Sequence, residues 1–537
     1  MPELGQKIIS SMRSMMTMRQ TLEYQWKDAI DYTFPLRAQG FSNNSSSAEA
    51  KAQSGFHQKA SIFDSTGPDS SRILASSTLS GLIPDGSNWF RMSIPSLDPE
   101  QIAMSFEIRS WLDDTAQVIQ KKINSSYFDS MAFETMLDTV IVGFAGLFIS
   151  IKDGELVFEH ISPDNMYIAD TMNKGRIDTV YRKMSMTIPA MVAEFGMNKI
   201  PETLKAMLRQ DPYDTKPQCV IHCVRPRMMN GKQAQGKQKR NMPWQSVWVH
   251  EGTGMVLKEG GYNEFPYAIP RWSRIPGTHY ATGAVNDVLP DIKTVNKVAE
   301  FILVHSETVI APPIVVKDDG VVNPQTVQFA PRRVIVVEDT ENLQALRLGG
   351  DFNVGEAQII RLQQQIRRGL MTDSLNPDQQ GTPATATEIR ARTRRVRQIL
   401  GPVFGRMQRE FLAPIVERVY NLCVRSGEIP PAPEAIANLE ILPIFNNPLS
   451  RAARQDDIDA MDQLEGYLGS VAQIDPTILD KYDGEKALDI RADILGVPNE
   501  VLRAAIDVEQ IRRQREEQQQ QLQQQLLAQQ GAQGETQ

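Results

Sequence analysis

Three residues near the middle of the chain have side chains that can bind a metal ion. They are Cys219, His222 and Cys223, and thiolate with imidazole suits zinc. A structural zinc site needs four ligands, however, and the third cysteine of the chain is far away, at Cys423. On an extended strand, residues 219 and 223 point to one face and residue 222 to the other. The spacing therefore favours small buried residues of a strand over a metal site.

An arginine-rich segment at 390–397 (RARTRRVR) has side chains that can contact phosphates. The alternative is the outer face of a long helix, with the guanidinium groups solvated or paired to neighbouring subunits, and this second interpretation is the favoured one. The segment lacks the aromatic residues and base-reading motif that sequence-specific nucleic-acid binding would need. We therefore predict an arginine belt between subunits, formed by Arg390, Arg392, Arg394, Arg395 and Arg397.

The chain lacks the short motifs that identify common kinds of enzyme. It has no GxxxxGK[ST] phosphate loop, no GxGxxG loop after a strand, no GxSxG nucleophile turn and no HExxH zinc motif. Adjacent acids occur at 113–114, 318–319 and 456–457, but such pairs are typical of solvated faces. We therefore expect no enzymatic activity, with no catalytic residues, no cofactor and no metal ion.

The net charge argues against a protein that coats nucleic acid. Lys and Arg total 57 against 65 Asp and Glu, a formal charge of −8, whereas a broad DNA-gripping surface is usually positive. The charged residues are also unevenly distributed along the chain. Residues 361–425 carry twelve Arg and five acidic residues, a net of +7, and residues 440–500 carry five basic and 13 acidic residues, a net of −8.

The remaining composition indicates a soluble chain in a reducing compartment. Three Cys in 537 residues cannot form a disulfide framework, and no secretory signal is visible. The most apolar stretch, 140–151, is too short for a membrane helix, which needs about 20 residues. We expect a buried strand there, ending at a turn over 152–154, and no association with a membrane.

Hydrophobic periodicity divides the chain into helical and strand-rich parts. Helices are expected over 3–34, 65–82, most of 101–150, about 284–309, 354–371 and 384–426. Gly401-Pro402 and Pro414 should bend the last of these. Strands are expected in LFISI, LVFEHI, TVYRKM, CVIHCV, SVWVH and AIPRW between 147 and 273, and again in an insert over 312–347. A loop is expected at 372–384, and an acidic helical unit at 445–505.

The order of these parts, together with several stretches of sequence, resembles the portal proteins of short-tailed bacteriophages, the head-to-tail connectors of their virions. The resemblance runs from about residue 20 to about residue 510, and its specificity lies in the order and spacing of the stretches. They are WKDAIDYTFP at 26–35, IFDSTGPDSSRILASSTLSGLIPDGSNWF at 62–90, HISPDNMYIADTMNKGRIDTVYRKMSMTIPAMVAEFG at 160–196, YATGAVNDVLPDIKTVNK at 280–297 and TPATATEIRARTRR at 382–395.

The resemblance implies an α+β, mostly helical portal fold that assembles as a ring. Its parts would be the wing at 1–280 and 385–445, stem helices at 281–309 and 352–371, the clip at 310–351, the tunnel loop at 372–384, the crown at 446–505 and a C-terminal helical barrel at 506–537. Twelve of the last 24 residues are Gln, which suits close-packed barrel helices. A disordered tail beyond 520 is the alternative.

The resemblance also implies where DNA and other proteins would make contact. The candidate tunnel-loop residues are Asp373, Ser374, Asn376, Asp378, Gln379 and Gln380. The candidate stem residues facing the channel are Lys293, Lys297, Arg361, Arg367 and Arg368. The candidate clip residues for motor or adaptor contacts are Lys317, Asp318, Asp319, Arg332 and Arg333.

The implied function is a dodecameric ring at one capsid vertex, a passive channel for double-stranded DNA during packaging and ejection. The implied partners are further copies of the chain, DNA without sequence specificity, the terminase large subunit, tail adaptor and tail or nozzle proteins, major capsid and scaffolding proteins, and internal core or ejection proteins at the barrel. The expected location is the virion, after assembly in the host cytoplasm. The alternatives are another oligomeric virion protein (an adaptor or scaffold) and, less favoured, a DNA-processing enzyme.

Overall fold

A computed structural model describes most of the chain, with helices predominating over strands. The residues described are 2–40, 59, 61–84, 88–96, 106–211, 216–229, 232–234, 236, 241–310, 314–316, 343–345, 352–375, 400–437, 439–446, 455–472, 475–495, 508, 510–515 and 517–519. The chain forms two compact units. The first comprises Met1–Thr78, Ser130–Phe148 and Glu159–Glu410, and the second comprises Leu79–Asp129, Ile149–Phe158 and Phe411–Gln537.

A five-stranded antiparallel sheet is the centre of the first unit. Its order is β10-β9-β6-β5-β4. The strands are β4 Met166–Ala169, β5 Thr179–Met186, β6 Gln218–Pro226, β9 Trp244–His250 and β10 Val256–Tyr262. Because β side chains alternate between faces, the apolar residues of one strand serve two cores.

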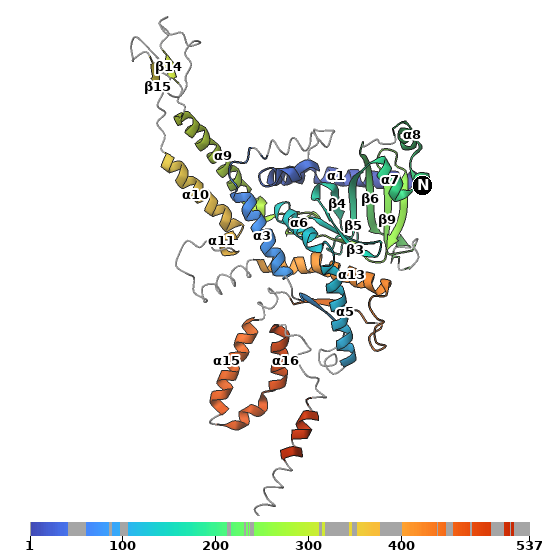
Figure 1. The fold of residues 1–537 in the computed structure, drawn as a ribbon, viewed down its shortest axis with the longest axis vertical. Coiled ribbons are helices and arrows are strands. Elements are labelled where there is room, and N and C mark those ends of the chain that lie inside the picture. Colours follow the sequence, from blue (N-terminus) through green and yellow to red (C-terminus); the bar gives the residue numbers. More distant parts are fainter. Residues whose placement is uncertain are drawn as a thin grey trace, which may run out of the picture. The chain divides into compact units, whose positions relative to one another are not determined.

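Helix α1, Pro2–Asp31, packs along one face of this sheet (Figure 1). Ile8, Ile9 and Met12 of α1 are buried against Ile221 and Val247 of the strands. On the other face lie α7, Ile188–Phe195, and α8, Glu202–Gln210, whose apolar residues cluster with Val220 and Leu257 of the sheet.

Shorter elements follow, and one of their sheets includes residues Ile149–Phe158 of the second unit. A second sheet has the order β11-β2-β3, with β11 Tyr267–Ala268, β2 Gly146–Lys152 and β3 Glu155–Ile161. A small hairpin pairs β12, Ser273–Arg274, with β13, Ala281–Thr282. A second short hairpin pairs β7, Met228–Met229, with β8, Lys232–Gln233.

Two long antiparallel helices follow the β12–β13 hairpin. Helix α9, Ala284–Ile310, leads to β14, Ile314–Val316, which pairs with β15, Leu343–Ala345. Helix α10, Phe352–Gly369, then returns along α9, as Figure 1 shows. Helix α3, Thr66–Leu82, begins in the first unit, where its Gly67 lies against Ile292 of α9. Helices α9 and α10 confirm the helices that hydrophobic periodicity predicts at about 284–309 and 354–371.

The described residues of the second unit include several helices and a two-stranded sheet. Strand β1, Phe90–Ser93, pairs antiparallel with β16, Leu442–Phe445. Helices α5, Phe106–Asn124, and α13, Ala413–Ser426, pack together, with α5 also against β1. Helix α6, Phe128–Ile141, begins in this unit and continues into the first. The helices of the acidic region are α15 Gln455–Ala472, the short 3-10 helix η6 Pro476–Lys481 and α16 Gly484–Leu495.

Three expectations about local structure are wrong. Val140 and Ile141 end helix α6, and the strand starts only at Gly146, because Gly143 with a φ of 114° turns the chain between them. The segment AIPRW contributes Ala268 to β11 and only an isolated bridge at Arg271. The expected loop at 372–384 opens with a helical turn, α11 Thr372–Leu375, in which the Thr372 hydroxyl donates to the carbonyl of Arg367 at 3.1 Å.

A π-helical turn lies just before Pro414, where the sequence predicts a bend. Residues Gln408–Leu412 form this turn, and α13 continues from Ala413. Proline has no amide hydrogen, so the carbonyl four residues earlier, on Glu410, loses its helical partner. The amide of Ile269 donates to that carbonyl instead, at 3.2 Å. The chemistry of one proline thus explains both the irregular turn and its contact with a distant segment.

Candidate functional site

The hairpin of α9 and α10 carries the stem residues predicted from the sequence. The two helices approach closely at two glycines. A β-carbon on Gly369 would lie 2.2 Å from Cγ1 of Val288, and one on Gly355 would lie 3.0 Å from Cδ1 of Ile302. These contacts fix the register: residue 288 is level with 369 and residue 302 with 355.

The two predicted lysines of α9 have acidic partners in their own chain. Lys293 forms an ion pair with Asp28 of α1, and its ammonium group lies 5.3 Å from the centre of the Tyr32 ring. Lys297 pairs with Glu300 at 2.8 Å and lies 4.8 Å from the centre of the Phe301 ring. These partners offset part of the positive charge that the two lysines present.

The other predicted residues divide into exposed positions and positions outside the described residues. Arg361, Arg367 and Arg368 of α10 are exposed, as is Asp373 of α11. The backbone of Ser374 lies in α11, but its side chain is outside the described set. The remaining predicted tunnel-loop, clip and arginine-belt residues lie outside the described residues: Asn376, Asp378, Gln379, Gln380, Lys317, Asp318, Asp319, Arg332, Arg333, Arg390, Arg392, Arg394, Arg395 and Arg397.

The hairpin also exposes large apolar side chains. On α9, Phe301 is 60% exposed and Val304 is 54% exposed, and on α10, Ile360 is 48% exposed. Residues 297, 301 and 304 share one helix face because they are spaced by four and three. A helix that is apolar on its outer side as well as its inner side is typical of a segment that packs on both sides.

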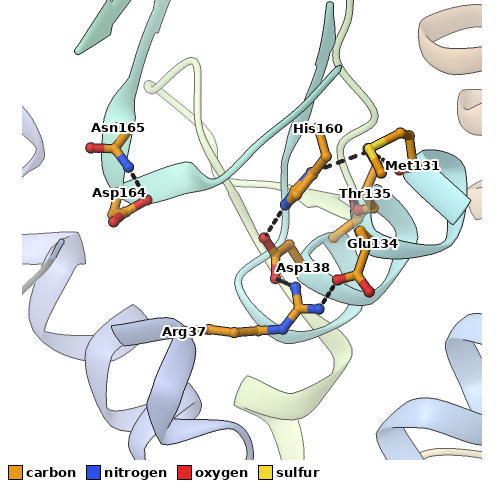
Figure 2. A network of polar contacts seen from close by, with 9 residues as sticks. Arg37, Met131, Glu134, Thr135, Asp138, His160, Asp164 and Asn165 are labelled. Atoms are coloured by element: carbon orange, nitrogen blue, oxygen red, sulfur yellow. Dashed lines mark hydrogen bonds and ion pairs between the residues drawn. The ribbon is translucent and has the colours of Figure 1, made fainter. Parts of the chain in front are cut away.

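Sequence reasoning missed a partly buried ionic cluster that joins three segments of the first unit, drawn in Figure 2. Arg37 follows α1 in the 3-10 helix η1, Pro35–Gly40, and contacts two acids of α6. Its guanidinium donates to Asp138 at 2.5 Å and forms a second ion pair with Glu134. Asp138 in turn lies 2.9 Å from Nε2 of His160 on β3. Glu134 and Asp138 are four residues apart, so they share a face of α6, but the sequence does not show their partners.

The same cluster contains a hydroxyl, an imidazole and a carboxylate in a row, an order found in hydrolases. Oγ1 of Thr135 lies 3.3 Å from Nδ1 of His160, whose Nε2 faces Asp138 (Figure 2). However, Thr135 is fully buried, and its hydroxyl donates to the carbonyl of Met131 at 2.7 Å. A buried hydroxyl whose proton is directed at the backbone cannot attack a substrate, so the row is a structural network.

A second buried ion pair, between Arg271 and Glu410, connects segments distant in sequence. Arg271 is 1% exposed, and its Nε donates to Glu410 at 2.9 Å. The guanidinium also donates to the carbonyls of His279 at 3.3 Å and Gly175 at 3.1 Å. Glu410 is the residue of the π-helical turn whose carbonyl accepts from Ile269. Other segments of the chain therefore bind both the side chain and the backbone carbonyl of Glu410.

The residues considered as metal ligands, Cys219, His222 and Cys223, lie in strand β6 of the sheet. Cys223 packs in the cluster beneath α1, whereas the His222 ring stacks on Trp248 with centroids 4.0 Å apart, so the two side chains face opposite sides, as predicted. His222 contacts the Ser246 hydroxyl at 2.9 Å and the Tyr267 hydroxyl at 3.2 Å.

Burial makes the two thiols poor metal ligands here. It raises the pKa of the Cys219 and Cys223 thiols to about 12, whereas zinc binds the thiolate. Within the described residues, no group of three or more His, Cys, Asp or Glu side chains is placed to hold a metal ion. None of the helices in that part of the chain combines the length and apolar composition that crossing a membrane requires.

The described residues form a protein of mixed helix and strand, with a buried core around the five-stranded sheet and apolar residues exposed along a helical hairpin. Comparison with known proteins narrows this class. Residues 5–502 match the model of the family described as bacteriophage head to tail connecting protein, and the chain belongs to that family. The family resemblance inferred from the sequence is thereby confirmed.

Individual relatives agree with this family. A protein of Bordetella phage BPP-1 described as a probable portal protein is 27% identical, with 98% of this chain and 93% of the relative covered. The portal protein of Salmonella phage epsilon15 is 24% identical, with 98% of this chain and 94% of the relative covered. Among solved structures, a chain in the virion of a native gene transfer agent particle has a TM-score of 0.34 at 12% identity, covering 76% of this chain and 87% of that chain.

Proposed function

We propose that twelve copies of this chain form a ring at one capsid vertex, a portal through which double-stranded DNA passes during packaging and ejection. The observation that carries the proposal is the sequence match over nearly the whole chain to two phage proteins described as portal proteins. The exposed apolar residues of the α9–α10 hairpin support association with further copies. In this proposal the chain is a virion component that assembles in the host cytoplasm.

The parts of the subunit have separate tasks in this proposal. Residues 1–280 and 385–445 form the wing, the α9–α10 hairpin the stem, 310–351 the clip, 372–384 the tunnel loop, 446–505 the crown and 506–537 the barrel. The clip binds the terminase large subunit during packaging and then the tail adaptor, to which tail or nozzle proteins attach. Capsid and scaffolding proteins surround the wing, and internal core or ejection proteins meet the barrel.

The channel is proposed to let DNA slide and not to hold it. The exposed arginines Arg361, Arg367 and Arg368 supply weak, repeated contacts to phosphates, while Lys293 and Lys297, which are ion-paired within the chain, contribute less. Twelve copies of a loop that carries Asp373 would repel phosphate, so the tunnel loop acts by steric gating. No step in this function requires catalysis, and the energy for packaging comes from the separate motor.

Electron microscopy of the purified protein, viewed down its axis, tests the proposal. We expect rings, and elution at about 700 kDa in size-exclusion chromatography, twelve times the 60.2 kDa of one chain. A protein that stays monomeric under all assembly conditions, with no rings in the images, would contradict the proposal. Incubation with DNA and Mg²⁺ tests the enzyme alternative, because cleavage that disappears when acidic residues are replaced would overturn the passive role.

A further inference from the structure

The outer sides of α9 and α10 differ in charge at the same height of the hairpin. On α9, the outer stripe consists of Lys297, Phe301 and Val304. On α10, the outer face at the matching height consists of Glu356, Ala357 and Ile360, all of them exposed. Both groups contain apolar residues, and each contains one charged residue of opposite sign to the other.

The glycine contacts determine which of these residues are level. Because residue 302 is level with 355 and the helices are antiparallel, Phe301 is level with Glu356 and Lys297 with Ile360. The ammonium group of Lys297 bends toward Glu300 and the ring of Phe301, which brings the positive charge toward the height of Glu356. The positive and negative charges on the two outer sides therefore lie at one height.

We infer that the outer stripe of α9 in one copy packs against the outer face of α10 in the next copy, with Lys297 facing Glu356 and Phe301 beside Ala357 and Ile360. This inference rests on the proposed ring. Rotation about a ring axis preserves height, so residues level within one hairpin stay level between neighbouring hairpins whose helices run along that axis. A ring repeats such a head-to-tail contact between every pair of neighbours. The apolar residues on both sides exclude water, and the charge pair sets the register.

Charge reversal tests the pairing directly. Like charges that face each other across an interface are strongly unfavourable, so we expect Lys297→Glu and Glu356→Lys each to reduce the ring fraction by at least about tenfold at fixed protein concentration. The double variant, K297E with E356K, restores the opposite charges and should recover rings. Lys7→Glu is a matched control, since Lys7 is also an exposed lysine with a glutamate partner on its own helix, Glu3 at 2.6 Å. It should form rings like the wild type.

Cross-linking provides a second readout that does not depend on loss of assembly. Phe301→Cys combined with Ala357→Cys should give disulfide-linked oligomers on oxidation, beyond those of either single variant. Absence of rings in the wild type would contradict the proposed ring itself. If the wild type forms rings, three results would each overturn the inferred pairing and leave the ring intact. They are rings in the single reversal variants, no recovery of rings in the double variant, and no cross-link between the two cysteines.

Discussion

The sheet region and the α9–α10 hairpin of the first unit differ in which side chains they bury and which they expose. In the sheet region, buried polar side chains find partners within the chain. Arg19 of α1 is 1% exposed and donates to the carbonyls of Pro163, Asp164 and Met166 at 3.0, 3.0 and 2.6 Å. In the α9–α10 hairpin, by contrast, even the large apolar side chain of Phe301 is 60% exposed.

This difference separates the requirements of folding from those of assembly. A buried guanidinium that lacked acceptors would cost several kcal/mol, so the sheet region has to complete its network before the chain is stable. An exposed apolar residue costs the single chain little, and its burial contributes only when a second surface covers it. Substitutions in the sheet region should therefore act on stability, and substitutions in the outer stripe on association.

The largest expected effect is on the Arg271–Glu410 pair. Arg271→Ala leaves the carboxylate of Glu410, which is 16% exposed, without its guanidinium, and removes the donor from two carbonyls. Breaking a buried pair in this way costs about 3–5 kcal/mol of unfolding free energy. Urea denaturation measures the loss, with the exposed Arg274→Ala as a control that should change the value by about 0.5 kcal/mol or less.

The pair can be tested further by removing both charges. A double variant, R271M with E410L, leaves no unpaired buried charge, so it should be more stable than Arg271→Ala alone. If Arg271→Ala is no more destabilising than Arg274→Ala, the sheet region does not depend on this network, and the contrast with the hairpin is lost.

A smaller effect is expected from pH. Burial, with a further contribution from Arg182 and Lys258, lowers the pKa of His222 from 6.5 to about 3 in the folded protein. The stabilisation by neutral His222 is therefore complete above pH 6.5 and is lost as the pH falls from 6.5 toward 3, since the unfolded chain then binds a proton that the folded chain does not. Between pH 6.5 and 4.5 this amounts to about 2 kcal/mol.

The contribution of His222 is the difference between two pH curves, because buried and paired carboxylates also titrate in this range. His222→Gln retains hydrogen bonding at this position and removes the titrating ring. Unfolding free energies from pH 7.5 to 4.5 should fall less steeply for the variant than for the wild type. Parallel curves would mean that His222 takes up its proton in the folded state, and that the packing around the sheet is looser than its burial indicates.

The sequence predicts the elements of both regions well and their buried polar contacts poorly. Periodic apolar residues are local, so they locate α9 and α10 and the strands of the sheet. Pro414 likewise predicts an irregularity, and the π-helical turn lies just before it. By contrast, the three carbonyls that accept from Arg19 lie 144 to 147 residues away, and an arginine that will be buried looks the same in a sequence as one on the surface.

The same limit applies to the candidate site. The sequence predicts Lys293 and Lys297 as stem residues, but only one of their two acidic partners is close in sequence. Glu300 is three residues from Lys297 and is visible in the sequence, whereas Asp28 reaches Lys293 only because α1 and α9 lie in contact. The exposed arginines of α10 remain predicted DNA contacts. Exposure of Phe301 could be identified only from the structure, because an apolar residue in an apolar helix is expected to be buried.

The smallest effect on the single chain, and the most direct test of the contrast, is expected in the outer stripe. Phe301→Ser combined with Val304→Ser should change the unfolding free energy of the monomer by about 0.5 kcal/mol or less, because both side chains are more than half exposed. Ile292→Ala, on the buried side of the same helix, should cost about 2–5 kcal/mol. Denaturation at concentrations low enough to keep the chain monomeric, with size-exclusion chromatography at higher concentration, separates the two effects. The serine variant should keep monomer stability and lose rings. If it unfolds as readily as Ile292→Ala, the outer stripe belongs to the core of the single chain and is not a surface kept for a neighbouring copy.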